Sequence, residues 1–236
     1  MKPLTRDEYE MVFPIVLQTL EDTNVTTYPL DLIKLYTILG IPHHAYNQCD
    51  VPTQQMEELS SDGFQRQMPG SDIPTVYVNT AQTFNRIKFT LAHELGHIMC
   101  VDLKRNTDPE RTADAFAGLI LAPIPLVMAT KQFSVEDISY NFSISRACAQ
   151  IAARDTRRRL NARDYPLTSD ERKFASICDI VSPAYGETQG VTKNWIRANA
   201  IPNHRRRRQS NRPVVNQFYY PHFLEALKEV ENGPRL

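Results

Sequence analysis

The stretch from Thr83 to Cys100 constrains the fold of this chain more than any other. Its apolar residues recur every three or four positions, as on the buried side of a helix: Phe84, Ile87, Leu91, Leu95 and Ile98. On this helix His93 and His97 are four residues apart, so both imidazoles project from one face, one above the other. The spacing predicts that the two rings converge on a single metal ion.

The residue types in this segment favour zinc. Zinc accepts neutral imidazole nitrogens, and a catalytic zinc site has three protein ligands with a fourth position for water. Glu94 follows the first histidine, so its carboxylate can take a proton from that water without binding the metal. A structural zinc site has no use for a free carboxylate there, so Glu94 favours catalysis. The alternative is an amphipathic helix whose histidines bind no metal.

The third ligand is expected from the following helix. Asp108-Pro109 is a helix start, with Asp as N-cap and Pro in the first turn, and a short loop can fold this helix back antiparallel to the first. Glu110 is then the favoured ligand, and Asp114, one turn later on the same face, is the alternative. If it does not bind the metal, Asp114 is expected to accept the N–H of one histidine and fix its tautomer.

The N-terminal residues predict further helices. One is expected at residues 5–23, where Pro14 should kink or split it. Another should start near Pro29 and end at Gly40. Residues 50–70 are polar and predict a loop with up to a turn of helix.

Two strands are predicted, at residues 41–46 and at Ile73–Asn79. In the second, two valines alternate with Tyr77 and Asn79, so one face is apolar and the other can contact a ligand. We expect this strand at a sheet edge, with Tyr77 and Asn79 binding a substrate that adds as an antiparallel strand. The alternative is an ordinary half-buried strand. The chain is therefore expected to be α+β, mostly helical, with a small sheet.

Residues 134–141 and 143–160 predict two helices joined by a very short turn, each with a serine N-cap. This is the outline of a helix-turn-helix. Five arginines on or near the second helix could contact phosphates: Arg146, Arg154, Arg157, Arg158 and Arg159. Because Cys148 and Ile151 on that helix indicate packing, a helical hairpin against the core is favoured, and direct DNA binding stays open but not favoured.

Charge divides the chain into unequal parts. Residues 1–150 carry 11 basic and 18 acidic side chains, which gives −7, whereas residues 151–236 carry 16 and 9, which gives +7. We expect a metallopeptidase core at 1–133, the helical pair at 134–162 and a basic C-terminal extension of unknown role at 163–236. Its run Arg205–Arg208 could dock an acidic protein, and its last helix is expected at 223–231.

The remaining composition favours a cytosolic protein. The four cysteines are far apart and form no C-x-x-C, so no disulfide framework is indicated. No run of about 18 apolar residues stands out as a membrane span, and the first residues lack the apolar core of a signal peptide.

Two stretches together resemble the ImmA/IrrE family of metallopeptidases: Arg86–His97, with its His-Glu-x-x-His motif, and Glu110–Pro123. The resemblance covers about residues 25–162. One departure is mild, since the family usually has Leu-Leu-Met-Pro where this chain has Ile-Leu-Ala-Pro at 120–123.

The resemblance implies a zincin-like core in which His93, His97 and Glu110 bind zinc and Glu94 is the general base. It also implies an endopeptidase that cleaves a partner transcriptional repressor, as an anti-repressor of a phage or mobile element or in stress-response control. A non-catalytic DNA- or protein-binding regulator and the toxin of a toxin–antitoxin pair are the alternatives on the same scaffold.

Overall fold

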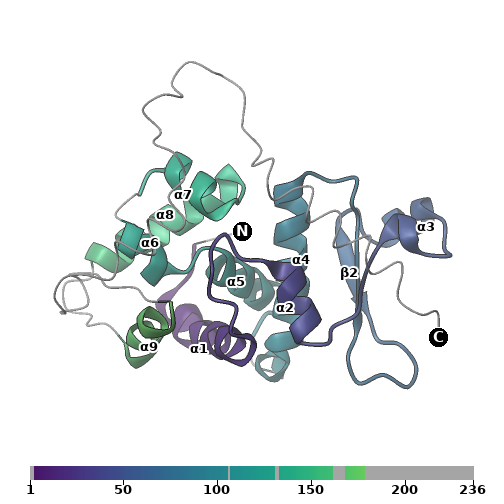
Figure 1. Cartoon of the computed structure of the whole chain (residues 1–236), viewed down its shortest axis with the longest axis horizontal. Helices are drawn as coiled ribbons and strands as arrows, with labels where there is room; N and C mark the ends of the chain where they lie inside the picture. Colours follow the sequence, from purple (N-terminus) through teal and green to yellow (C-terminus); the bar gives the residue numbers. More distant parts are fainter. Residues whose placement is uncertain (1–2, 106, 131–132, 162–167, 179–236) are drawn as a thin grey trace, which may run out of the picture.

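The computed structural model describes residues 3–105, 107–130, 133–161 and 168–178 (Figure 1). Within these residues the helices are α1 Arg6–Thr23, α2 Leu32–Ile38, α3 Thr53–Leu59, α4 Phe84–Met99, α5 Pro109–Leu121, α6 Ile124–Thr130, α7 Val135–Phe142, α8 Arg146–Asn161 and α9 Ser169–Ile177. The strands are β1 His43–Ala45, β2 Gly63–Arg66 and β3 Thr75–Val78, and short 3₁₀ turns occupy Tyr46–Gln48 and Val101–Arg105. The expected α+β class, mostly helical with a small sheet, is confirmed.

The three strands form one sheet in the order β1-β3-β2, with β1 parallel and β2 antiparallel to β3. The predicted strand at 73–79 is therefore the central one, and its expected place at an edge is wrong. The reason is β2, whose residues were expected to be a loop. A glycine and two polar residues in four positions give β2 no apolar alternation, so its pairing comes from tertiary contact.

Helix α4 stands between the sheet and the group formed by α1 and α5–α9, whereas α3 lies on the outer side of the sheet (Figure 1). The middle of its apolar stripe, Ile87, Leu91 and Leu95, is almost fully buried, as its periodicity predicts, and the stripe ends in the partly buried Phe84 and Ile98. Antiparallel to α4 runs α5, and the two approach closely at Gly96. A Cβ placed there would lie 2.9 Å from Ala113 Cα, so only glycine fits this contact.

Residues Pro109–Thr130, which comprise α5 and α6, are long and apolar enough to cross a membrane, with a mean hydropathy of 1.7. This differs from the expectation that no stretch would qualify. Of the apolar window, 89% is buried inside the protein, as in a core helix. The composition of this stretch is explained by its packing.

The helical pair α7–α8 packs on this core. Ser134 caps α7 as predicted, but Ser143 does not cap α8, because it ends α7 in the left-handed conformation with φ 49°. Ser145 instead accepts the backbone N–H of Cys148 and opens α8. The buried ammonium of Lys88 in α4 donates to the carbonyl of Phe142, 3.0 Å away, and so ties the end of α7 to α4.

Two prolines were expected to shape the first two helices, and the structure differs from both expectations. Pro14 lies inside α1 without dividing it. Helix α2 begins at Leu32 rather than near Pro29, because Asp31 caps it by accepting the N–H of Lys34. Gly40 follows α2 with φ +65°, as expected.

Of the predicted C-terminal extension, the structure describes residues 168–178. They contain α9, which packs on α1 through the rings of Phe13 and Phe174, 5.7 Å apart. The Arg205–Arg208 run and the helix expected at 223–231 lie outside the described residues.

Candidate active site

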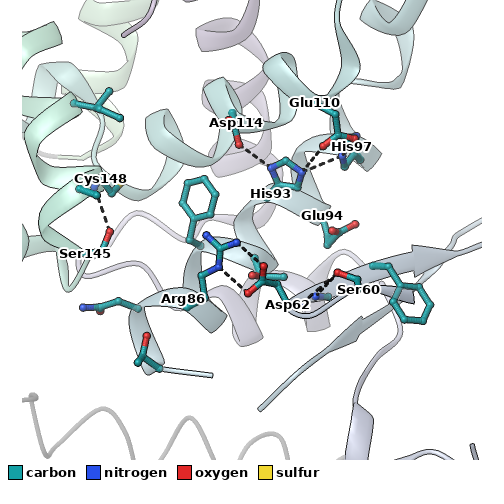
Figure 2. A pocket seen from close by; sticks show the side chains of 18 of the residues that line it. Ser60, Asp62, Arg86, His93, Glu94, His97, Glu110, Asp114, Ser145 and Cys148 are labelled. Atoms are coloured by element: carbon teal, nitrogen blue, oxygen red, sulfur yellow. Dashed lines mark hydrogen bonds and ion pairs between the residues drawn. The ribbon is translucent and has the colours of Figure 1, made fainter. Parts of the chain in front are cut away.

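A cleft of about 1140 Å³ runs along the exposed face of α4. It is lined by the start of α5, by the segment from Ser60 to Gln65 that includes most of β2, and by α8 on the opposite side (Figure 2). The two predicted histidines, Glu94, Glu110 and Asp114 all line this cleft.

His93, His97 and Glu110 converge at the floor of the cleft (Figure 2). The Nε2 atoms of the two histidines are 3.1 Å apart, and each lies 3.3 Å from a carboxylate oxygen of Glu110. In a tetrahedral zinc site with bonds of about 2.0–2.1 Å, neighbouring ligand atoms lie about 3.3–3.4 Å apart. The three side chains therefore fit a single tetrahedral ion.

Local sequence explains how Glu110 reaches the histidines. Asp108 accepts the N–H groups of Glu110 and Arg111, so α5 starts where the sequence predicts. The close contact at Gly96 brings this first turn against the last turns of α4. Glu110, rather than Asp114, is the carboxylate that meets both Nε2 atoms.

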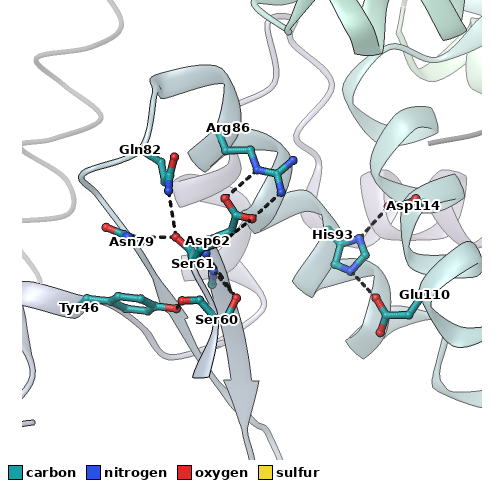
Figure 3. A network of polar contacts seen from close by, with 11 residues as sticks. Tyr46, Ser60, Ser61, Asp62, Asn79, Gln82, Arg86, His93, Glu110 and Asp114 are labelled. Carbon is teal, nitrogen blue, oxygen red and sulfur yellow. Dashed lines mark hydrogen bonds and ion pairs between the residues drawn. The ribbon is translucent and has the colours of Figure 1, made fainter. Parts of the chain in front are cut away.

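Asp114 lies on the other side of His93 and accepts a hydrogen bond from Nδ1 at 3.1 Å (Figure 3). With Nδ1 protonated, Nε2 keeps its lone pair and points toward Glu110 and His97. Burial lowers the pKa of His93, but the bond to Asp114 and the charges of nearby carboxylates raise it overall. Asp114 therefore has the contact predicted for a residue that orients a ligand.

Glu94 is only 7% exposed, although it lines the cleft. In the metal-free protein, burial raises its pKa to about 7; His93 opposes this shift and Glu110 adds to it. A carboxyl group with this pKa can both accept and release a proton near neutral pH.

The predicted substrate residues Tyr77 and Asn79 have other contacts. Asn79 is buried and donates to Glu57 and to the carbonyl of Ser61. The Tyr77 ring stacks on Phe64, with centroids 5.2 Å apart. Because β3 is paired on both sides, neither residue can receive an added strand, and the predicted substrate strand is wrong.

The cleft also brings together residues that sequence reasoning did not select. Arg86 donates to both carboxylate oxygens of Asp62, at 2.8 and 2.5 Å, and so fixes the start of β2 against α4 (Figure 3). Arg86 precedes His93 by seven residues on the same helical face, which was the available signal. Nothing in the sequence around Asp62 indicated this contact.

Tyr and His are residue types that could bind a developing oxyanion, and three of them lie outside this cleft. Tyr140, His43 and His44 are absent from the described residues that line the cleft. His43 is buried with its Nδ1 against the carbonyl of Ile41, and His44 lies beside Tyr77 on the sheet.

An α+β core, a helix with paired histidines, a glutamate between them and a third carboxylate define a metallopeptidase-like protein. Residues 50–146 match the family model Peptidase_M78, described as the IrrE N-terminal-like domain, so this part of the chain is similar to that family. The predicted resemblance to ImmA/IrrE proteins is thereby confirmed. No curated protein and no solved structure matches the chain.

Proposed function

We propose that the protein is a zinc-dependent endopeptidase that hydrolyses a peptide bond in a partner regulatory protein, a helix-turn-helix transcriptional repressor. One observation carries the catalytic part of this proposal. His93, His97 and Glu110 meet at ligand spacing on the floor of an open cleft, with Glu94 beside them. The match to a peptidase family supports it.

Zinc is the metal that this donor set favours. Two imidazoles and one carboxylate make up a known type of catalytic zinc site and leave a fourth position open. When bound, zinc supplies a Lewis acid that polarises the scissile carbonyl. His93 and His97 offer Nε2, Glu110 offers its carboxylate, and Asp114 holds His93 in the tautomer that this role requires.

Glu94 is proposed to move the proton. Its carboxylate accepts a proton from the attacking water and then gives it to the amine of the leaving peptide. Burial keeps the carboxyl group away from bulk solvent, and its position beside His93 places it next to the metal position.

The edge strand β2 replaces β3 as the proposed site of the substrate backbone. It pairs only with β3 in the described sheet, and Gly63, Phe64 and Gln65 line the cleft. An extended peptide can add to this edge through main-chain hydrogen bonds. Gly63 allows the strand to lie against α4, because a Cβ there would be 2.5 Å from Thr90.

Glu94→Gln tests the proposal. The substitution keeps the shape of the side chain but removes its basicity, and losing a general base lowers rates roughly 10²–10⁴-fold. Co-expression with a candidate helix-turn-helix repressor should give one or few new fragments with the wild type and almost none with Glu94→Gln. Mass spectrometry identifies the fragments.

Binding of the regulator should be retained by Glu94→Gln in a pull-down. If both proteins relieve repression equally and no fragment forms, the protein acts by binding alone.

A further inference from the structure

The two faces of α8 have different environments. One face is buried in the core through Ala149, Ala152 and Ala153. The stripe that lines the cleft recurs at intervals of three and four: Ala147, Gln150, Ile151 and Arg154. Helix α8 is therefore the wall of the cleft opposite β2, where a bound peptide would meet it.

Most arginines of α8 are engaged by the protein itself. Arg146 binds Glu136, Arg157 binds the carbonyl of Phe133, Arg158 binds Asp155, and Arg159 binds Glu171. Arg154 differs from them: it is exposed, lines the cleft, and makes no hydrogen bond or ion pair with any described residue.

The other cationic side chains among the described residues of the cleft contact carboxylates. Arg86 donates from Nε and Nη2 to the two carboxylate oxygens of Asp62, so its charge is compensated (Figure 3). Glu110 and Asp114 both contact His93. Among the described residues that line the cleft, Arg154 is thus the cation that remains available to a carboxylate of a bound molecule.

Resting on the proposed peptidase function, we propose that Arg154 forms a specificity subsite for an Asp or Glu side chain of the substrate. Gln150, one turn earlier on the same stripe, adds an amide N–H donor to this subsite. A guanidinium binds a carboxylate with charge-assisted hydrogen bonds, whereas a Lys or Arg at that substrate position would be repelled. Ala147 and Ile151 leave the neighbouring surface apolar.

A peptide-binding experiment tests this subsite without requiring catalysis. Zinc-loaded Glu94→Gln protein selects from random peptides displayed on phage, and the bound peptides are sequenced. We expect Asp and Glu to be enriched about fivefold to tenfold at one position. With Arg154→Glu added, the preference should turn to Lys and Arg. Arg157→Glu makes the same charge change on the same helix, outside the residues that line the cleft, and should alter nothing.

The outcomes separate the two proposals. If peptides show no acidic preference, or one that Arg154→Glu leaves unchanged, or if none is enriched, the subsite is wrong. Arg154-dependent binding of duplex DNA instead of peptides would overturn it too. If acidic peptides are selected through Arg154 but the wild type cuts none of them, the subsite stands and the peptidase function fails.

Discussion

His93 uses its two ring nitrogens for different partners. Nδ1 donates to Asp114, and Nε2 faces His97 and Glu110. The hydrogen bond to Asp114 keeps the proton on Nδ1, so Nε2 has a free lone pair that can bind a metal ion. Glu110 and Asp114 are both carboxylates on one helical face, so their roles differ only through which histidine atoms they meet.

Substitutions of Glu110 and Asp114 should change the metal content of the protein to different extents. We expect about one zinc per chain in the wild type, and little in His93→Ala, His97→Ala or Glu110→Ala. Asp114→Asn should still bind zinc but about 10–100-fold more weakly, because an orienting partner is lost. Zinc titration with a competing chelator measures both effects, with exposed Glu58→Ala as control. If Asp114→Ala loses the metal and Glu110→Ala keeps it, the ligand assignment is reversed.

At the scale of elements, the distance between α4 and α5 determines whether the third ligand reaches the first two. That distance is set by Gly96, which lies between the histidine ligands and against Ala113. The glycine is therefore part of the packing that brings Glu110 to the two histidines of the proposed metal site.

Gly96→Ala should weaken both folding and metal binding. A methyl group 2.9 Å from Ala113 Cα forces the helices apart, at a cost of about 1–3 kcal/mol in the free energy of unfolding. Urea denaturation and zinc titration give the two quantities. Leu20→Ala in α1 is the control, because it removes a buried side chain away from the cleft and should lower stability alone. Normal zinc affinity in Gly96→Ala would contradict this view.

Elements whose signals lie within a single segment of the sequence could be predicted from that sequence. Helix α4, the α5 start and the His93/Glu94/His97 motif follow from periodicity and capping residues, and they were found. Strand β2 was missed because Gly63–Arg66 carries no alternation, and the edge was then assigned to β3. The choice between Glu110 and Asp114 rested on spacing and family resemblance, and only the packing of α5 on α4 shows which carboxylate meets both rings.

In the whole molecule, the N-terminal strap, residues 3–5, links three helices around the cleft. The carbonyl of Pro3 accepts from Arg111 in α5, and the N–H of Leu4 donates to Asp155 in α8. Glu8 in α1 accepts the N–H of Thr5 and binds Arg111. Arg111 is the neighbour of Glu110, so the strap also holds the start of α5.

Stability should therefore depend on pH through Glu8. Hydrogen bonds from Arg111 lower its pKa from 4.5 to about 2, against an opposing effect of burial. A lowered pKa in the folded state stabilises the protein above the unfolded pKa, and this contribution is lost as pH falls toward 2. Glu8→Gln should lower the free energy of unfolding by about 1–2 kcal/mol at pH 7.

Urea denaturation between pH 7 and 3.5 measures the free energy of unfolding of the wild type and of Glu8→Gln. The difference in free energy of unfolding between wild type and Glu8→Gln should stay constant above about pH 5.5 and become smaller below about pH 4.5. A gap that stays constant down to pH 3.5 would show that Glu8 acts through shape rather than charge.

The strap also affects how the protein should be handled. Pro3 lines the cleft that contains the proposed metal ligands, and its carbonyl accepts a hydrogen bond from Arg111, the residue next to Glu110. Pro3 thus brings the start of the described chain to this cleft, and the imidazoles of an N-terminal polyhistidine tag would compete for a metal ion. Metal stoichiometry and peptide binding are therefore best measured after an N-terminal tag has been removed.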